Sequence, residues 1–259
     1  MKISRRQAIK EISLLAGSLW FSACSLTTKE TIPFTPVDNF GRSKNNLTIA
    51  LLGATGMAGG YILREALVQG YDVRVLARSP AKLDALKNRV TIIKGDVRDA
   101  VSIPELLRGS DVVISALGPV KSDGPAAARD ICTVATGLIL HAMQQLQVKR
   151  YILVSGAAVS MPGDDRNFLG WMIQKLAQLT LSAAVRDKEA EYKLLVESPV
   201  QWTLVRCPVI EAVPYLHPAK ATLATPASFF LRAGELARFV IEQVDSQEYI
   251  RKGPFLGSF

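Results

Sequence analysis

Short apolar runs alternate with longer amphipathic stretches between residues 47 and 206. The runs are five or six residues long and rich in β-branched side chains, which is typical of strands buried on both faces of a parallel sheet. The stretches between them place apolar residues at helical spacing. We therefore expect strands over residues 47–52, 72–77, 90–94, 111–116, 151–155 and 202–206, with helices over 57–69, 80–87, 101–108, 129–147 and 168–197.

This order of elements predicts the α/β class, with a doubly wound parallel sheet whose two faces are covered by helices. The alternation loosens after residue 206. Pro208, Pro214, Pro218 and Pro226 predict irregular chain with short strands, and apolar residues over 233–244 predict a closing helix. We expect a small C-terminal cap from about residue 207 that covers the open end of the sheet.

The first 24 residues have the layout of an export signal. Basic residues, among them Arg5 and Arg6, precede an apolar run over 12–23, which is shorter than the roughly 20 residues of a membrane-spanning helix. The segment around Arg5 and Arg6 resembles the twin-arginine export signal. The alternative is an uncleaved N-terminal anchor that keeps the protein on the cytoplasmic face.

The signal ends in Phe21-Ser22-Ala23-Cys24, which resembles a bacterial lipobox, with Phe21 where leucine is usual. The resemblance implies a lipid on Cys24 that anchors an exported protein to the membrane on the periplasmic or equivalent side. The alternative is an incidental cysteine beside an ordinary cleavage site. Residues 25–46 are polar and contain two prolines, so they predict a flexible tether to a domain over 47–259.

Composition narrows the function classes. The chain has 259 residues, of which 49% are hydrophobic and 21% charged, and this balance excludes disordered and collagen-like proteins. The net charge of +8 is spread without a long basic block, which fits a solvated surface or an anionic small ligand better than a nucleic-acid-binding stripe, so we expect no nucleic-acid partner. His141 and His217 lack further ligands at metal spacing, so we expect no metal site. Cys132 and Cys207 lie in apolar segments and should be buried thiols, with their pairing left open.

A glycine-rich turn follows the first expected strand and precedes the first expected helix. Gly53 would permit the turn, Gly56 the approach of a phosphate, and Gly59 the packing of helix on strand. Backbone N–H groups and the helix dipole then face a dinucleotide pyrophosphate. Thr55 and Met57, in the same turn, are further candidate cofactor contacts. The alternative is a purely structural turn.

The end of the second expected strand carries Arg78 where an acidic residue would bind the ribose of NAD, and Ser79 follows it. A cation there accommodates the 2′-phosphate of NADP, so the sequence favours NADP over NAD. Asp96 and Val97, after the third strand, are candidates for the adenine side, whereas Asp99 should cap the following helix. After the fourth strand the candidates, which could equally form a structural turn, are Ala116, Leu117 and Gly118.

The segments GATGMAGG, GDVRDA, SALGP, YILVSG and QWTLVRCP follow one another in this order. Together they resemble the atypical short-chain dehydrogenase/reductase group, with its NmrA-like and flavin- or biliverdin-reductase-like members. The resemblance covers residues from about 46 to the end and implies a Rossmann-like fold that binds NAD(P). It does not specify the substrate.

Active short-chain dehydrogenases carry a tyrosine followed four residues later by a lysine, which lowers the phenol pKa. That pair is missing here, because Ala184 precedes Lys188 and Val196 follows Tyr192 at this spacing. The resemblance makes Ser155 and Lys188 the candidate catalytic residues, and both are also candidate cofactor contacts. The alternatives are a Ser155 that bonds a neighbouring backbone group and a Lys188 that is a solvated helix charge.

Within the expected 168–197 helix, apolar residues recur at helical spacing. They would either pack on the sheet or line an apolar pocket for a flat, hydrophobic substrate. These residues are Leu169, Met172, Ile173, Leu176 and Leu179, with Phe168 and Trp171 beside them.

The sequence thus predicts an NADP(H)-binding oxidoreductase that transfers hydride directly to a small organic acceptor. Solvent or the acceptor would supply the proton that the missing tyrosine would donate. The alternative is a non-catalytic NADP-binding protein that acts as a redox sensor or as an assembly factor for a membrane complex.

Overall fold

The computed structural model describes residues 47–118 and 129–259, and its centre is an eight-stranded sheet in the order β3-β2-β1-β4-β5-β6-β10-β8. The first six strands of this order are mutually parallel. This arrangement confirms the predicted doubly wound α/β fold. Their bounds are β1 Thr48–Leu52, β2 Asp72–Ala77, β3 Thr91–Lys94, β4 Val112–Ser115, β5 Arg150–Gly156 and β6 Gln201–Cys207.

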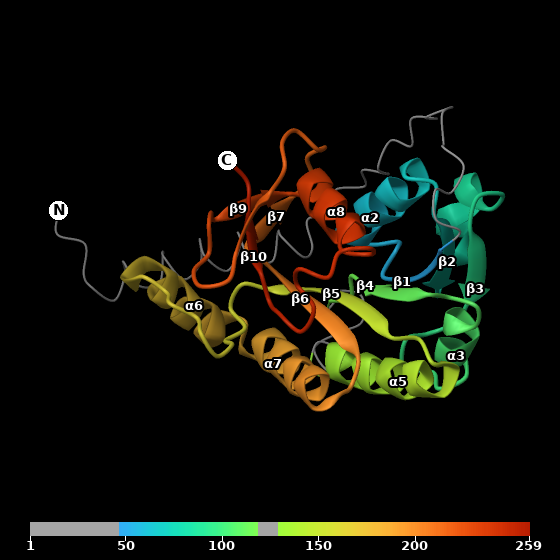
Figure 1. Ribbon diagram of the computed structural model, residues 1–259, viewed down its shortest axis with the longest axis horizontal. Coiled ribbons are helices and arrows are strands. Elements are labelled where there is room, and N and C mark those ends of the chain that lie inside the picture. The colour runs from blue at the N-terminus through green and yellow to red at the C-terminus, as the bar shows by residue number, and fades with distance from the viewer. Residues whose placement is uncertain (1–46, 119–128) are drawn as a thin grey trace, which may run out of the picture.

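Helices cover both faces of the sheet (Figure 1). One face carries α2 (Met57–Val68) and α8 (Ala233–Glu242), and the other carries α3 (Ser102–Leu107), α5 (Ile131–Leu146) and α7 (Ser182–Glu197). Each face has its own buried apolar cluster. The strands are apolar on both sides because both sides are buried, which is why continuous apolar runs predicted them.

Two predicted helices differ from the observed ones. The 80–87 stretch forms a 3₁₀ helix, η1 (Pro80–Leu86), and the 168–197 stretch is divided at Leu181 into α6 (Phe168–Thr180) and α7. Leu181 leaves helical geometry at φ −122° and ψ 32°. The Thr180 hydroxyl donates to the Leu176 carbonyl, a bond that competes with regular helix geometry at this point.

The C-terminal cap is more regular than its prolines suggest. β10 (Phe255–Gly257) extends the sheet in parallel beside β6, and β8 (Lys220–Thr222) closes the edge antiparallel to β10. A second sheet pairs β7 (Val209–Glu211) with β9 (Phe230–Arg232). β10 escaped prediction because three residues are too few to show a period of two.

A buried carboxylate joins the parts of the cap. Glu235, at the start of α8, is 1% exposed and accepts hydrogen bonds from Arg232 at 2.9 Å, from the His217 backbone N–H at 3.3 Å and from the Ser258 hydroxyl. Burial raises the pKa of Glu235, but the bonds from Ser258 and Arg232 outweigh it and hold the pKa below its usual value. Strand β9, the 214–218 loop and the C-terminus are therefore joined through one side chain.

Cys132 and Cys207 are buried and free, as expected. None of the helices in the 47–118 and 129–259 portions is long and apolar enough to span a membrane. The predicted export signal, Cys24 and the 25–46 tether lie outside the described residues.

Candidate functional site

The carboxyl ends of the six parallel strands bring most of the predicted site residues to one edge of the sheet. The chain runs from β1 to β2 in one direction and reaches β4 on the other side, so β1 and β4 flank the topological switch point, where doubly wound folds bind ligands. The turn after β1 and the turn after β4 touch here, since a Cβ on Gly53 would lie 2.7 Å from the Ala116 carbonyl oxygen.

The glycine turn is shaped by close backbone contacts. Gly53 has φ +81°, which favours glycine, and its carbonyl accepts the Gly56 N–H at 2.9 Å. A Cβ on Gly59 would lie 2.0 Å from the Gly53 carbonyl oxygen, so no other residue fits there without displacing the turn. Gly56 begins α2 without a capping side chain, and the exposed Thr55 precedes it, so the first N–H groups of the helix face outward.

The turns after β2 and β3 lie beside the glycine turn. Arg78 and Ser79 are exposed directly after β2. The Asp96 carboxylate accepts the Arg98 backbone N–H at 2.9 Å, and Asp99 accepts the N–H groups of Val101 at 3.0 Å and Ser102 at 3.2 Å. Asp99 thus caps the start of α3, and these bonds, led by one from the Ser102 hydroxyl, lower its pKa.

The turn after β4 contains Ala116, Leu117 and Gly118, all of which are partly exposed. The Leu117 carbonyl accepts a weak bond from the Cys132 thiol at 3.7 Å. Burial raises the pKa of Cys132, so this thiol is an inert packing group rather than a nucleophile.

Ser155, at the end of β5, is 5% exposed, and its Oγ has no hydrogen-bond partner among the described residues. Ser155 pairs in register with Arg206 of β6. A buried hydroxyl without a partner costs free energy, so such an atom points to a ligand that completes its bonding. The structure does not support the alternative in which Ser155 bonds a neighbouring backbone group.

Lys188 is largely buried, with a side chain 13% exposed, and it is paired, so its interpretation as a solvated charge is wrong. Its Nζ lies 2.9 Å from Oε2 of Glu191 and 3.2 Å from the Val154 carbonyl oxygen, one residue before Ser155. Burial alone would lower the pKa of Lys188, but the neighbouring Cys132 and Glu191 side chains raise it above its ordinary value. The ammonium is therefore a fixed positive charge beside the end of β5.

A chain of hydrogen bonds holds Glu191 in turn. The Thr136 hydroxyl donates to Oε1 of Glu191 at 2.8 Å and lies 3.1 Å from the Tyr151 hydroxyl. Burial raises the pKa of Tyr151, which keeps this phenol neutral. Glu191 is fully buried, and each of its carboxylate oxygens accepts a hydrogen bond, one from Thr136 of α5 and one from Lys188 of α7.

Asp187 belongs to the same helix but has a structural role. It is 2% exposed and accepts the backbone N–H groups of Cys132 and Thr133, both at 2.9 Å. A residue 54 positions away in sequence thus caps the start of α5, which its own Asp130 does not do. Sequence reasoning missed this cap because it looks for a capping residue next to the helix.

These residues fit a bound dinucleotide. The glycine turn offers backbone N–H groups at the start of α2, and Ser155, at the same edge of the sheet, offers a hydroxyl without a partner among the described residues. The proton donor of active short-chain dehydrogenases has no equivalent, because Ala184 stands one turn before Lys188. Tyr192 does not replace it, since its ring packs edge-on against Trp202 at 5.9 Å.

A pocket of about 400 Å³ lies beyond Ser155. Its walls come from the ends of β5 and β6, from α6 and from the 225–230 loop. The lining includes Ala157, Pro208, Leu176, Ala177 and Phe229, so most of it is apolar. The pocket therefore adjoins the nicotinamide end that the resemblance implies.

Several apolar residues of helix α6 do not pack on the sheet, which was one of the two roles that the sequence predicted for them. Gln174 and Ala177 are buried, but Phe168 is 76% exposed and Leu179 81% exposed. Packing of the whole face on the sheet is therefore wrong. Leu176 lines the pocket, Trp171 and Met172 are exposed, and the side chains of Leu169 and Ile173 lie outside the described ones.

A buried ion cluster forms the wall of the pocket at Arg166. Asp164 accepts two bonds from Arg206 Nη1, at 2.7 and 2.8 Å, and one from Arg166 Nη2 at 3.1 Å. Burial lowers the pKa of both arginines, and Asp164 opposes that effect. Arg206 also lies 3.6 Å from the centre of the Phe255 ring.

Sequence reasoning missed Glu191, Thr136, Arg166, Arg206 and Gln174. The spacing of Lys188 and Glu191 on one helix was the one available signal, because residues three apart face each other. The others come from segments far apart in sequence that meet only in the fold.

Metal ligands do not gather anywhere in the described parts of the chain. His141 contacts Gln145 at 3.0 Å, and it lines a second cavity, of about 530 Å³, at the C-terminal ends of α5 and α7. That cavity lies near the amino ends of β5 and β6 and holds none of the candidate site residues.

Comparisons with known proteins agree with this geometry. A protein family described as NAD(P)H-binding matches residues 53–246. Cinnamoyl-CoA reductase 1 of Petunia hybrida is 23% identical over 228 residues, which span 76% of this chain and 68% of that enzyme. Photosystem II assembly factor Ycf39 of Cyanophora paradoxa is 25% identical over 212 residues, which span 78% of this chain and 60% of that protein.

Solved structures show the same fold. The anaerobillin reductase ChuY from Escherichia coli superposes with a TM-score of 0.66 at 18% identity, covering 81% of this chain and 95% of that one. A short-chain dehydrogenase/reductase from Veillonella parvula, in complex with NADP, superposes with a TM-score of 0.66 at 17% identity, covering 82% and 94%.

Proposed function

Because this chain belongs to the NAD(P)H-binding family, we propose that it is an NADP(H)-dependent oxidoreductase acting on a small, flat and apolar organic acceptor. The observation that carries the proposal is the buried Ser155 hydroxyl, which lacks a partner among the described residues at the end of β5. Lys188 lies within hydrogen-bond distance of the Val154 carbonyl, one residue before Ser155, and the lining of the apolar pocket begins at Ala157, two residues after this serine. This is the arrangement that a bound acceptor would complete.

The chemistry divides between the cofactor and the chain. When bound, NADPH supplies a hydride to the acceptor. Ser155 donates a hydrogen bond to the acceptor's oxygen or nitrogen, and the fixed charge of Lys188 stabilises negative charge that develops nearby. Neither residue is a proton donor of the tyrosine type, so water or the acceptor itself provides the proton.

The acceptor test is a single-turnover mix of the NADPH-loaded chain with flavins and linear tetrapyrroles. Loss of the reduced-nicotinamide absorbance is expected with at least one of them. Ser155→Ala should slow that step by about 10²-fold, because it removes a hydrogen bond that strengthens as charge develops. An unchanged rate in Ser155→Ala would remove Ser155 from the mechanism, and no absorbance loss with any acceptor would overturn the enzymatic proposal.

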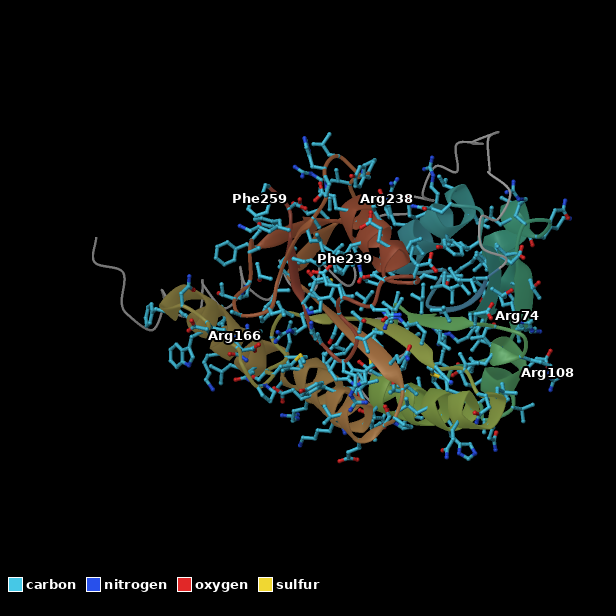
Figure 2. The ribbon with its side chains drawn as sticks, viewed as in Figure 1. Arg74, Arg108, Arg166, Arg238, Phe239 and Phe259 are labelled. Atoms are coloured by element: carbon cyan, nitrogen blue, oxygen red, sulfur yellow. The ribbon has the colours of Figure 1, made fainter. Side chains whose placement is uncertain are left out.

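Arg78 supports the choice of NADP over NAD, since a guanidinium pairs well with a 2′-phosphate. Arg78→Glu should weaken NADPH binding by about 10-fold or more and leave NADH binding nearly unchanged. Arg108→Glu is the matched control, because Arg108 is 72% exposed at its side chain and follows α3, at the opposite edge of the sheet (Figure 2). Equal binding of NADPH and NADH by the unaltered chain would contradict the preference.

The second candidate is a non-catalytic NADP-binding assembly factor. Similarity to Ycf39 favours it, as does the alanine at position 184 where active relatives carry the proton-donating tyrosine. It predicts tight NADPH binding without hydride transfer. Co-purification with a membrane complex, lost in a variant that cannot bind NADPH, would favour this function over catalysis.

For location we propose twin-arginine export and a lipid on Cys24, which would tether the domain to the membrane by residues 25–46. Because the twin-arginine route carries folded proteins, the domain could leave the cytoplasm with its nucleotide bound. Mass spectrometry of the protein extracted from native membranes tests this: a diacylated Cys24 at the N-terminus is expected. An intact Met1 would instead indicate the uncleaved anchor.

A further inference from the structure

We propose that the 400 Å³ pocket between α6 and the 225–230 loop binds an apolar molecule that carries an anionic group, and that Arg166 and Thr225 hold that group. The pocket is then the acceptor site, so this step rests on the proposed function and narrows its substrate class to apolar acids. A carboxylate is the anion that best matches one guanidinium and one hydroxyl.

Among the described residues, the charge balance at the pocket wall leaves one positive charge without an anionic partner. Arg166 and Arg206 both contact Asp164, so two guanidinium groups share a single carboxylate. Their side chains are 8% and 1% exposed, so water screens this excess poorly. Arg206 is also bound by the Gly253 carbonyl at 2.8 Å, whereas Arg166 lines the pocket. An anion in the pocket would balance the excess charge through Arg166.

Two polar atoms on the pocket lining are buried without a hydrogen-bond partner among the described residues. These are Nε of Arg166 and Oγ1 of Thr225. Nη2 of Arg166 is occupied, since it donates to the Val159 carbonyl at 3.0 Å and to Asp164 at 3.1 Å. Buried donors rarely lack a hydrogen-bond acceptor, and both of these atoms can donate to one anion.

The remaining lining selects the body of the ligand. Apolar residues supply most of the wall, and the amide of Gln174, which also lines it, donates to the Ala158 carbonyl and the Ser160 hydroxyl. An apolar body gains from leaving water here, while the anion satisfies Arg166 and Thr225. Ala157 lies two residues after Ser155, so a ligand anchored at Arg166 extends toward the end of β5. Figure 2 shows Arg166 beside α6.

A pair of fluorescent probes tests the anion preference without any variant. Anilinonaphthalene sulfonate and N-phenylnaphthylamine share one ring system, but only the first carries an anionic group. The unaltered chain should bind the sulfonate at least about 10-fold more tightly, as expected for a charge-assisted hydrogen bond in a buried site. Equal affinity of the two probes would overturn the proposal.

Variants assign the preference to the pocket. Arg166→Gln should reduce the preference for the sulfonate to about twofold or less, and Thr225→Val should reduce it by a smaller factor. Lys175→Gln is the matched control, because it removes an exposed positive charge from α6 outside the pocket lining. A preference that survives in folded Arg166→Gln, or that disappears in Lys175→Gln, would place the anion elsewhere and overturn the assignment. Should Arg166→Gln not fold, displacement of the sulfonate probe by naphthoate but not by naphthamide gives the same test on the unaltered chain.

The outcome is separable from that of the proposed function. Probe binding needs neither nucleotide nor turnover, and NADPH binding is measured on its own. A sulfonate preference with no hydride transfer to any acidic acceptor would leave the pocket assignment in place and remove the oxidoreductase proposal. Hydride transfer to an uncharged acceptor, unaffected by Arg166→Gln, would leave the oxidoreductase proposal in place and remove the pocket assignment.

Discussion

The two ends of the site edge are built by different means. At β1 the binding surface is backbone: a glycine turn, a left-handed residue at Gly53 and the start of α2, all within ten residues. Beyond β5 the surface is made of side chains, with Arg166, Gln174 and Thr225 brought together from separate segments. The first end suits a ligand whose phosphates and ribose are constant, and the second suits a ligand that differs between relatives.

This difference explains how specificity could change on one scaffold. A backbone site tolerates few substitutions, because a Cβ at Gly59 collides with the Gly53 carbonyl. A side-chain site can exchange Arg166 or Thr225 while the sheet and the glycine turn stay in place. Function therefore follows the side-chain end, and the fold alone does not identify the acceptor.

The largest expected effect comes from the Lys188–Glu191 pair beside the end of β5. Glu191→Leu leaves the Lys188 ammonium buried without its carboxylate, so unfolding should become easier by about 4 kcal/mol, as for other broken buried pairs. Denaturant titration measures this. Glu197→Gln, at the exposed end of the same helix, should change stability by about 0.5 kcal/mol or less.

A second substitution distinguishes charge from shape in the same experiment. Lys188→Met combined with Glu191→Leu removes both charges, so most of the lost stability should return. If the double variant is as unstable as Glu191→Leu alone, packing rather than the unpaired charge is responsible. The contrast between the two ends of the site would then fail here, because Lys188 and Glu191 would contribute through packing alone, like any core residues.

The next effect tests the backbone end. Gly59→Ala places a methyl group 2.0 Å from the Gly53 carbonyl oxygen, so the chain should lose about 3 kcal/mol of stability together with NADPH binding. Gly137→Ala is the control, since its Cβ would meet nothing within 4 Å on α5 and should stabilise the helix by about 0.5–1 kcal/mol. Normal NADPH affinity in Gly59→Ala would show that the turn does not shape the cofactor site.

The contrast between local backbone features and side chains from distant segments also determined which features the sequence could predict. The strands β1 to β6, the glycine turn and the cap by Asp99 depend on neighbouring residues, and each was found from local pattern and spacing. The break at Leu181, the Asp187 cap on α5 and the Arg206 cluster depend on contacts between distant segments. Tertiary packing sets these features, so no local pattern carried them. Lys188 was singled out as a candidate by resemblance, but its partner and its burial were not predicted.

The smallest effect concerns the buried Glu235 carboxylate, which joins β9, the 214–218 loop and Ser258. The hydrogen bonds to the Glu235 carboxylate hold its pKa below the ordinary value of 4.5, so they contribute stability at neutral pH that is lost as pH falls through the lowered pKa. Glu235→Gln should therefore cost about 1 kcal/mol at pH 7, and the difference from the unaltered chain should shrink below about pH 4.

Thermal unfolding between pH 7 and pH 3 measures that difference, with Glu242→Gln on the exposed end of α8 as the control. A difference that stays constant over this range would mean that Glu235 acts by shape alone. A shrinking difference would show that the C-terminal cap depends on an ionised Glu235. The glycine turn contains no titratable side chain, so Gly59→Ala should show the same loss of stability at both pH values.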